Sequence, residues 1–387
     1  MTGSNRRRAA TLGLLGLGAA AGWLALSTAQ ADQAPSDKAA PAGKTMGFAV
    51  TNFPFALYKG ADDCPDGPVL SAKDIYLKSV SPAEQKRLQL PENLKEFEQK
   101  AYHTADGRDV CEVLDLPREP QRSPKGKISY GMNLDGTKDG AATATTCAHE
   151  KFTSPDGEPV DNQTYRVMGC MSNYRGPPGE QGYLESLRNS GFKDGGTTFL
   201  IELIGVKDPK NDNDIQVGIY NGTSQMAVDP SGSTFLPYAS LTVTDDKRWR
   251  SVVHGRIVDG VVMTDPGDIA LTYVFGGAPR DYHIKAARLR LQILPDGKAK
   301  GMLAGYMDMP DVDMTKGTKQ ASAEMVKYDC PSIYQAIRRY ADGYKDPSTG
   351  KCTALSTAFQ VEAIPAFIIH PEEAKKTADA SSPTETR

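Results

Sequence analysis

The densest group of possible metal ligands in this sequence lies between Asp135 and Asn162, among glycine turns. Its first six residues, DGTKDG, place oxygen-bearing side chains at positions 1, 3 and 5 and a glycine at position 6. This is the first half of a twelve-residue calcium-binding loop. Position 12, normally a bidentate glutamate, is Thr146, and the flanking pattern does not indicate helices. The segment is therefore not an EF-hand, although its oxygens suit a hard cation.

Downstream carboxylates and amides can complete a calcium shell, which needs about six to eight oxygens. Clustered carboxylates repel one another unless a cation neutralises them, and this favours an ion. We therefore expect calcium as a cofactor, bound by Asp135, Thr137, Asp139, Asp156, Asp161 and Asn162. The alternative is an ordinary turn-rich loop, since Asp-Gly and Ser-Pro-Asp-Gly also form turns without a metal.

Two histidines are candidates for acid–base chemistry, although the usual catalytic motifs are absent. His149 and Glu150 stand in the sequence CAHE, but there is no HExxH zinc motif and no GxSxG nucleophile elbow. His254 is the other candidate. If the protein is an enzyme, we expect His149, Glu150 or His254 near its site. The CxxCH motif of haem attachment is also absent, so we expect no haem, and we expect no nucleotide.

A basic stripe is the second candidate binding feature. If KRWRSVVHGRI is one continuous strand, its basic side chains share one face and Trp249 points into the core on the other. Guanidinium groups bind carboxylates and phosphates through paired hydrogen bonds. We expect this face to bind a ligand or an acidic partner, or else to be the solvated outer face of a sheet. Its residues are Arg250, His254 and Arg256, extended by Arg288 and Arg290 of a later strand.

The amino terminus has the features of a bacterial export signal. Three arginines at positions 6–8 precede an apolar segment, 9–26, and Ala29-Gln30-Ala31 is a small-x-small cleavage site. We expect residues 1–31 to be a signal peptide and the protein to be periplasmic or secreted. Sec export is favoured over the twin-arginine route, because two alanines follow the arginines.

Charge and hydropathy exclude some partners. The formal net charge is −3, and loss of the arginine-rich leader makes the mature chain more negative, which argues against nucleic acid. No segment after the leader is apolar for long enough to span a bilayer, so we expect no transmembrane segment in the mature chain.

Six cysteines in an exported chain predict three disulfides, and the absence of a CxxC pair favours a structural role. The sequence does not fix their pairing. Pairing in sequence order would link Cys147 to Cys170 around the calcium loop and Cys330 to Cys352 around a helix. The cysteines are Cys64, Cys111, Cys147, Cys170, Cys330 and Cys352.

From Phe199 onward the pattern indicates successive antiparallel strands. Asp259-Gly260 and Asp296-Gly297 each mark a hairpin, and apolar and polar residues alternate from Arg288 to Ile293. Such patterns favour a two-sheet sandwich or a barrel. We expect a mainly β fold, an antiparallel two-sheet sandwich of jelly-roll or lectin-like type. A few peripheral helices and the disulfides should complete it.

Helical segments and one last strand flank this β region. We expect a helical stretch over 81–103, broken near Pro91 and with Leu94, Phe97 and Ala101 on one buried face. A second helix should follow Cys330 and use Gly343 as its C-cap. Pro365 should place the last strand, FQVEAIPAFII, at a sheet edge.

These elements give a domain division. We expect a disordered leader over 32–45, one composite domain over 46–370 and a disordered tail over 371–387. Within the domain we expect a mixed amino-terminal part (46–146), the β core (147–315), and a helical clasp with the last strand (316–370).

The favoured function is that of an exported β-sandwich protein of the bacterial envelope, not an enzyme, with a calcium-organised loop. It would bind a small molecule, a glycan or an envelope protein. One alternative is a secreted hydrolase or lyase acting on a polysaccharide or ester. Another is a structural accessory subunit of an envelope assembly.

Overall fold

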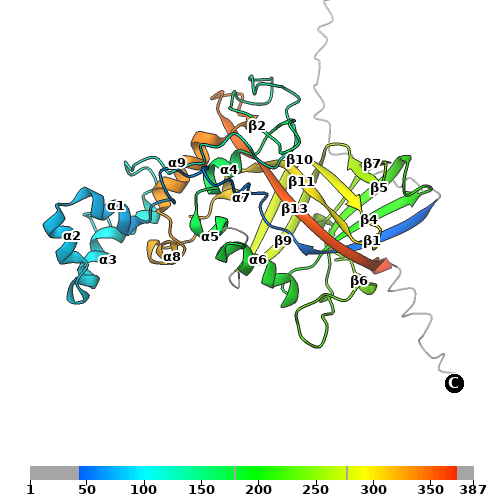
Figure 1. Cartoon of the computed structure of the whole chain (residues 1–387), viewed down its shortest axis with the longest axis horizontal. Coiled ribbons are helices and arrows are strands. Elements are labelled where there is room, and N and C mark those ends of the chain that lie inside the picture. The colour runs from blue at the N-terminus through cyan, green and yellow to red at the C-terminus, as the bar shows by residue number, and fades with distance from the viewer. Residues whose placement is uncertain (1–42, 178–179, 276–277, 373–387) are drawn as a thin grey trace, which may run out of the picture. The chain divides into compact units, whose positions relative to one another are not determined.

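The computed structural model describes residues 43–177, 180–275 and 278–372 (Figure 1). The expected signal peptide, most of the expected leader and nearly all of the expected tail lie outside these residues. The first strand already begins at Lys44, inside the segment for which we expected disorder.

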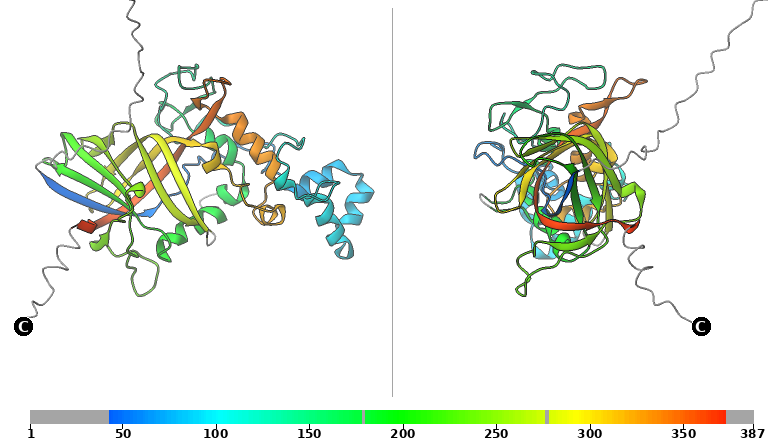
Figure 2. Two further views of the ribbon diagram at one scale, coloured as in Figure 1. Left: turned by 180° about the vertical axis from the view of Figure 1, so that it is seen from behind. Right: turned by 90° about the vertical axis from the view of Figure 1, so that its right-hand side faces the viewer.

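Eight antiparallel strands form a closed barrel, seen end-on in the right-hand view of Figure 2. Each strand pairs with the next, and the last pairs with the first. In spatial order they are β1 (Lys44–Asn52), β4 (Phe199–Val206), β5 (Asp212–Asn221), β7 (Arg250–Val258), β8 (Val261–Thr264), β10 (Ala278–Ile293), β11 (Ala299–Asp308) and β13 (Cys352–Ile369).

The prediction of a two-sheet sandwich is therefore wrong. A strand with one buried face shows the same alternation in a sandwich and in a barrel, so the local pattern did not separate the two folds. The difference lies in the pairing of β1 with β13, where Thr51 donates a hydrogen bond to the carbonyl of Glu362, 311 positions away. Pro365 lies inside this ladder, opposite Phe48, so the expectation that it marks an edge is also wrong.

Side chains fill the barrel, so it is a packed core. One inward row runs from Phe48 through Ile201 to Ile219, all at most 4% exposed. Leu289 and Leu291 of β10 also face inward and are 1% and 0% exposed, as the alternation predicted. The hairpin at Asp259-Gly260 is present, with positive φ at both residues, which a type I′ turn requires.

Five further strands of the described residues lie outside the barrel path. Three of them pair with barrel strands: β6 (Ala239–Thr242) and β12 (Gly343–Lys345) with β13, and β9 (Gly267–Phe275) with β10. The other two, β2 (Phe152–Thr153) and β3 (Pro159–Val160), form a separate hairpin. Trp249 belongs to the short helix η3 (Lys247–Trp249) before β7 and is half-buried, so its expected place in the core is wrong.

Along the chain the helices form three successive groups, coloured blue to cyan, green and yellow to orange in Figure 1. The first contains α1 (Ala72–Ser79), α2 (Pro82–Leu88), η1 (Pro91–Asn93) and α3 (Leu94–Tyr102), with η2 (Val110–Glu112) after them. The second contains α4 (Gln163–Met168), α5 (Ser172–Arg175) and α6 (Tyr183–Lys193), and the third α7 (Met309–Val312), α8 (Gln320–Met325) and α9 (Cys330–Tyr340). None of the helices in the described ranges has the length and apolar character that spanning a membrane requires.

Two details of these helices differ from the predictions. In α3, Phe97 and Ala101 are buried as expected, but Leu94 is 43% exposed because it stands at the first residue of the helix. The C-cap of α9 is Ala341, and Gly343 instead begins β12.

Three disulfides are present, as the six cysteines predicted. They join Cys64 to Cys170, Cys111 to Cys330 and Cys147 to Cys352, over sequence separations of 106, 219 and 205 residues. The bridges that sequence order suggested do not form. Proximity along the chain misled this expectation, because the barrel brings the start of β13 beside the loop that carries Cys147.

Candidate functional site

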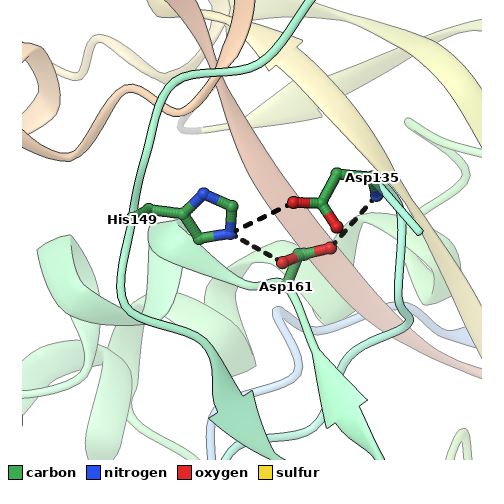
Figure 3. A group of neighbouring side chains, drawn as sticks. All are labelled: Asp135, His149 and Asp161. Atoms are coloured by element: carbon green, nitrogen blue, oxygen red, sulfur yellow. Dashed lines mark hydrogen bonds and ion pairs between the residues drawn. The ribbon is translucent and has the colours of Figure 1, made fainter. Parts of the chain in front are cut away.

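Three candidate residues from the sequence converge beside the barrel (Figure 3). The Nε2 atom of His149 lies 2.8 Å from Oδ1 of Asp161 and 3.9 Å from Oδ2 of Asp135. The ligand-type atoms of the three side chains all lie within 4.8 Å of one another. We call Asp135, His149, Asp161 and the contacting residues Lys151 and Asp342 the buried cluster.

Backbone contacts hold the cluster together. The N–H of Asp161 donates to the carbonyl of Met132 at 2.9 Å, and that of His149 donates to the carbonyl of Gly140 at 3.0 Å. Gly140 has a φ of +76°, and a Cβ there would come within 2.0 Å of the His149 carbonyl oxygen, so the close approach requires glycine. The turn chemistry of DGTKDG thus positions His149, whether or not the turn binds a metal.

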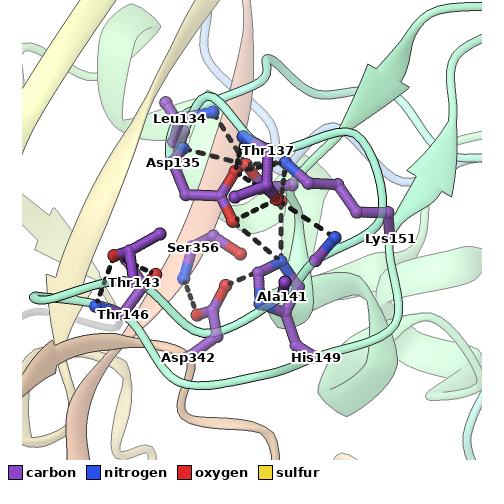
Figure 4. A network of polar contacts seen from close by, with 12 residues as sticks. Leu134, Asp135, Thr137, Ala141, Thr143, Thr146, His149, Lys151, Asp342 and Ser356 are labelled. Carbon is purple, nitrogen blue, oxygen red and sulfur yellow. Dashed lines mark hydrogen bonds and ion pairs between the residues drawn. The ribbon is translucent and has the colours of Figure 1, made fainter.

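Lys151 places a positive charge between two of the carboxylates (Figure 4). Its Nζ atom lies 2.6 Å from Oδ1 of Asp135 and 2.8 Å from Asp161, and it also donates to Asn133 at 2.8 Å. Its side chain is 6% exposed, and those of Asp135 and Asp161 are fully buried. The ammonium therefore supplies the neutralising charge for which the sequence argument invoked calcium.

The six expected calcium ligands do not share one site. Thr137 lies beside Asp135 and donates its hydroxyl to that carboxylate at 2.9 Å. Asp139 and Asp156 are exposed to solvent, and Asn162 is buried and donates its amide to the carbonyls of Ala56 and Tyr130. The structure therefore brings together only Asp135, Thr137 and Asp161, and calcium stays a prediction.

Asp342, which the sequence analysis missed, completes the buried cluster. It is fully buried, and its Oδ1 atom accepts the backbone N–H of Ser356 at 2.7 Å. Its Oδ2 atom lies 3.8 Å from Nε2 of His149 and has no hydrogen-bond partner among the described residues. Burial raises the pKa of Asp342 to about 7. No local sequence signal marks this residue, because only the folded chain brings it to His149.

The same contacts shift the pKa of His149 in favour of its charged form. Burial lowers that pKa, but the hydrogen bond to Asp161 and the negative charge of Asp342 outweigh burial and raise it to about 9. Burial also opposes ionisation of Asp161, yet the bonds from His149 and Lys151 lower its pKa below the usual range. The cluster thus contains an imidazolium and an ammonium that balance buried carboxylates.

The expected catalytic pair is divided. The side chain of His149 is 6% exposed, whereas that of Glu150 is 63% exposed and pairs with Arg166 at 3.1 Å. His254 lies on the outer face of the barrel, 2.7 Å from Asp265. The buried cluster has almost no solvent-accessible surface that a substrate could contact, so its arrangement suits the fixing of a loop.

The basic stripe is present on the outer face, but most of its members are engaged. Arg250 pairs with Glu372 at 3.1 Å, His254 and Arg256 share Asp265, and Arg288 donates to the carbonyl of Asn133 at 2.6 Å. Within the stripe, Arg290 alone has no side-chain hydrogen bond or ion pair with a described residue. It lines a shallow groove of about 430 Å³ together with Lys300 and Gln360.

A cavity of about 1070 Å³ lies where α5, α6, α7 and α8 meet β9 and the first half of β10. Its apolar lining includes the buried side chains of Tyr174, Leu184, Tyr273, Val312 and Tyr328. Its ionisable lining residues are Arg280, Asp281, His283, Asp311, Asp313 and Lys316. Sequence reasoning missed this cavity, because its walls come from elements dispersed between positions 173 and 328.

Comparisons with known proteins add no functional information: no family model, no curated protein and no solved structure matches this chain.

Proposed function

We propose that this protein is an exported binding protein that holds a small apolar or amphipathic molecule in the cavity between β9, β10 and helices α5–α8. The cavity volume of about 1070 Å³ carries the proposal. Sites for small molecules are concave, largely apolar and roughly 300–1,000 Å³ in volume, with a few polar groups that orient the ligand. The aromatic lining and the few charged side chains at this cavity fit that description.

Exposed apolar side chains at the cavity support the same proposal. Tyr183 and Met325 both line it, and they are 59% and 81% exposed. Exposed apolar surface is unfavourable in water, and its grouping beside a cavity is typical of a ligand entrance. The three disulfides support the exported location, since such bonds persist in oxidising compartments.

The buried cluster favours binding over hydrolysis. A general base must come within hydrogen-bond reach of its substrate. His149 is surrounded by Asp161, Asp342 and the carbonyl of Cys147, and its side chain is 6% exposed. The secreted hydrolase therefore has less support than a binding protein, and the accessory-subunit alternative does not require a cavity.

Binding of the neutral dye Nile red to the mature chain tests the proposal. Ser322 lines the cavity from α8, and its neighbour Ala321 does not, although both are exposed. We expect dye fluorescence to rise on binding, Ser322→Trp to weaken binding about tenfold or more by filling the cavity, and Ala321→Trp to leave it unchanged. Absence of dye binding, or equal effects of the two tryptophans, would overturn the proposal.

A further inference from the structure

Two of the three acidic side chains at the cavity are held by hydrogen bonds within the chain. Asp311 accepts hydrogen bonds from the backbone N–H of His283 at 3.2 Å and lies 3.0 Å from its Nδ1 atom. Asp313 accepts both the backbone N–H and the hydroxyl of Thr315, at 2.8 and 2.6 Å. The third, Asp281, is exposed and has no side-chain hydrogen bond or ion pair with a described residue; the pKa of Arg248 is raised chiefly by Asp246 and only weakly by Asp281. The hydrogen bonds fix the positions of Asp311 and Asp313 without removing their charge.

The basic side chains at the cavity are not engaged. Neither Arg280 nor Lys316 has a side-chain hydrogen bond or ion pair with any residue in the described ranges. Arg280 is half-buried and lies close to Tyr328 in the cavity wall. Burial and the charge of Asp313 raise the pKa of the Tyr328 hydroxyl to about 12, and the charge of Arg280 opposes the rise. Arg280 and Lys316 are therefore cationic side chains of the lining that are free to pair with an anionic group of a ligand.

A second group of unsatisfied polar atoms lies directly behind the cavity wall. Tyr174 and Tyr273 line the cavity, and both interact with Arg188, whose guanidinium also stacks 4.3 Å from the ring centre of Phe55. Arg188 is 4% exposed and lies 3.5 Å from Glu185, a contact too poorly aligned to be a hydrogen bond. The Nε and Nη1 atoms of Arg188 and both carboxylate oxygens of Glu185 are buried without hydrogen-bond partners in the described structure.

Such atoms are rare in folded proteins, because an unmade buried hydrogen bond costs about 1–3 kcal/mol. Burial raises the pKa of Glu185, and the charge of Arg188 opposes that rise. Arg188 and Glu185 form an ion pair at 3.5 Å within the core. The wall formed by Tyr174 and Tyr273 thus has unsatisfied buried donors of Arg188 behind it.

We propose that the ligand is an anionic amphiphile, in which an apolar body packs on the aromatic wall and a carboxylate pairs with Arg280. This inference rests on the proposed function and names its ligand class. A guanidinium binds a carboxylate through two parallel hydrogen bonds, which gives both orientation and affinity. Lys316, an exposed residue of the cavity lining, contributes a second, weaker attraction for the same anion.

Three probes with one alkyl chain and different head groups test the inference: dodecanoate, dodecan-1-ol and dodecyltrimethylammonium. The affinity of each probe is measured by its displacement of Nile red from the mature protein, at concentrations below those at which the probe aggregates. We expect dodecanoate to bind about tenfold more tightly than the alcohol, as one charge-assisted interaction implies, and the ammonium probe to bind most weakly.

Substitutions test which residue is responsible for the preference for dodecanoate over the alcohol. Arg280→Gln should bring dodecanoate to the affinity of the alcohol, and Lys316→Gln should reduce the preference by a smaller factor. Arg339→Gln, an exposed arginine on α9 away from the cavity, is the matched control and should keep the full preference. Unchanged unfolding midpoints would show that the variants are folded.

The outcomes separate the two proposals. If the alcohol binds wild-type protein as tightly as dodecanoate, or if Arg280→Gln keeps the preference, the anionic ligand class is overturned while the cavity remains a binding site. If Nile red and all three probes fail to bind the wild-type protein, the proposed function itself fails.

Discussion

Replacement of Lys151 by methionine removes the positive charge between Asp135 and Asp161 while keeping most of the side-chain volume. The ammonium makes contacts of 2.6 and 2.8 Å to two fully buried carboxylates. Loss of one partner of a buried ion pair costs about 3–5 kcal/mol, because the remaining charge stays buried and uncompensated. We expect Lys151→Met to lower the free energy of unfolding by about this amount.

Urea denaturation with the disulfides intact measures this loss. Lys127→Met is the matched control: that side chain is 81% exposed and lies 4.0 Å from Glu150, so its loss should cost less than about 1 kcal/mol. A double variant, Lys151→Met with Asp135→Asn, should cost less than the sum of the single variants, because it also removes one stranded charge. A loss below about 1 kcal/mol for Lys151→Met would refute the role of the ammonium and favour a bound cation instead.

Two further predictions concern the same cluster. His149 has its pKa raised to about 9 and Asp342 to about 7, so each keeps a proton in the folded state that it loses earlier in the unfolded state. The free energy of unfolding should therefore fall as pH rises from about 4 to 7, where Asp342 loses its proton. It should fall by about a further 3 kcal/mol from about pH 6.5 to 9, where His149 loses its proton. Urea titrations that show stability rising across this range would contradict the two pKa shifts. Because Lys151 already neutralises the carboxylates, EGTA should leave the melting temperature unchanged, and a clear drop would instead support the calcium prediction.

The sequence predicted the strands far better than their closure. Alternation along β10 placed Leu289 and Leu291 in the core, and Asp259-Gly260 placed a turn correctly, because both signals act over a few residues. Barrel closure depends on β1 and β13, which lie at opposite ends of the described chain. The disulfide pairing depends on the same closure, so it was equally inaccessible to local reasoning.

The candidate site was predicted in part for a similar reason. Asp135 and Asp161 were found because turn chemistry and clustered acids are visible in the sequence. Lys151 resembles any exposed lysine until the fold places it between them, and Asp342 reaches His149 only through the segment between α9 and β12. The cavity left no local signal, because each of its walls reads as an ordinary amphipathic helix or strand.

Hydrogen–deuterium exchange of the mature protein, with and without dodecanoate, tests the central claim most directly. A ligand in the cavity should slow exchange in α6, in α8 and along β9 and the start of β10, whose side chains line it. The groove beside Arg290 and the loop that carries His149 should not change. Protection confined to that groove or that loop, or no protection at saturating dodecanoate, would contradict a ligand site at this end of the barrel.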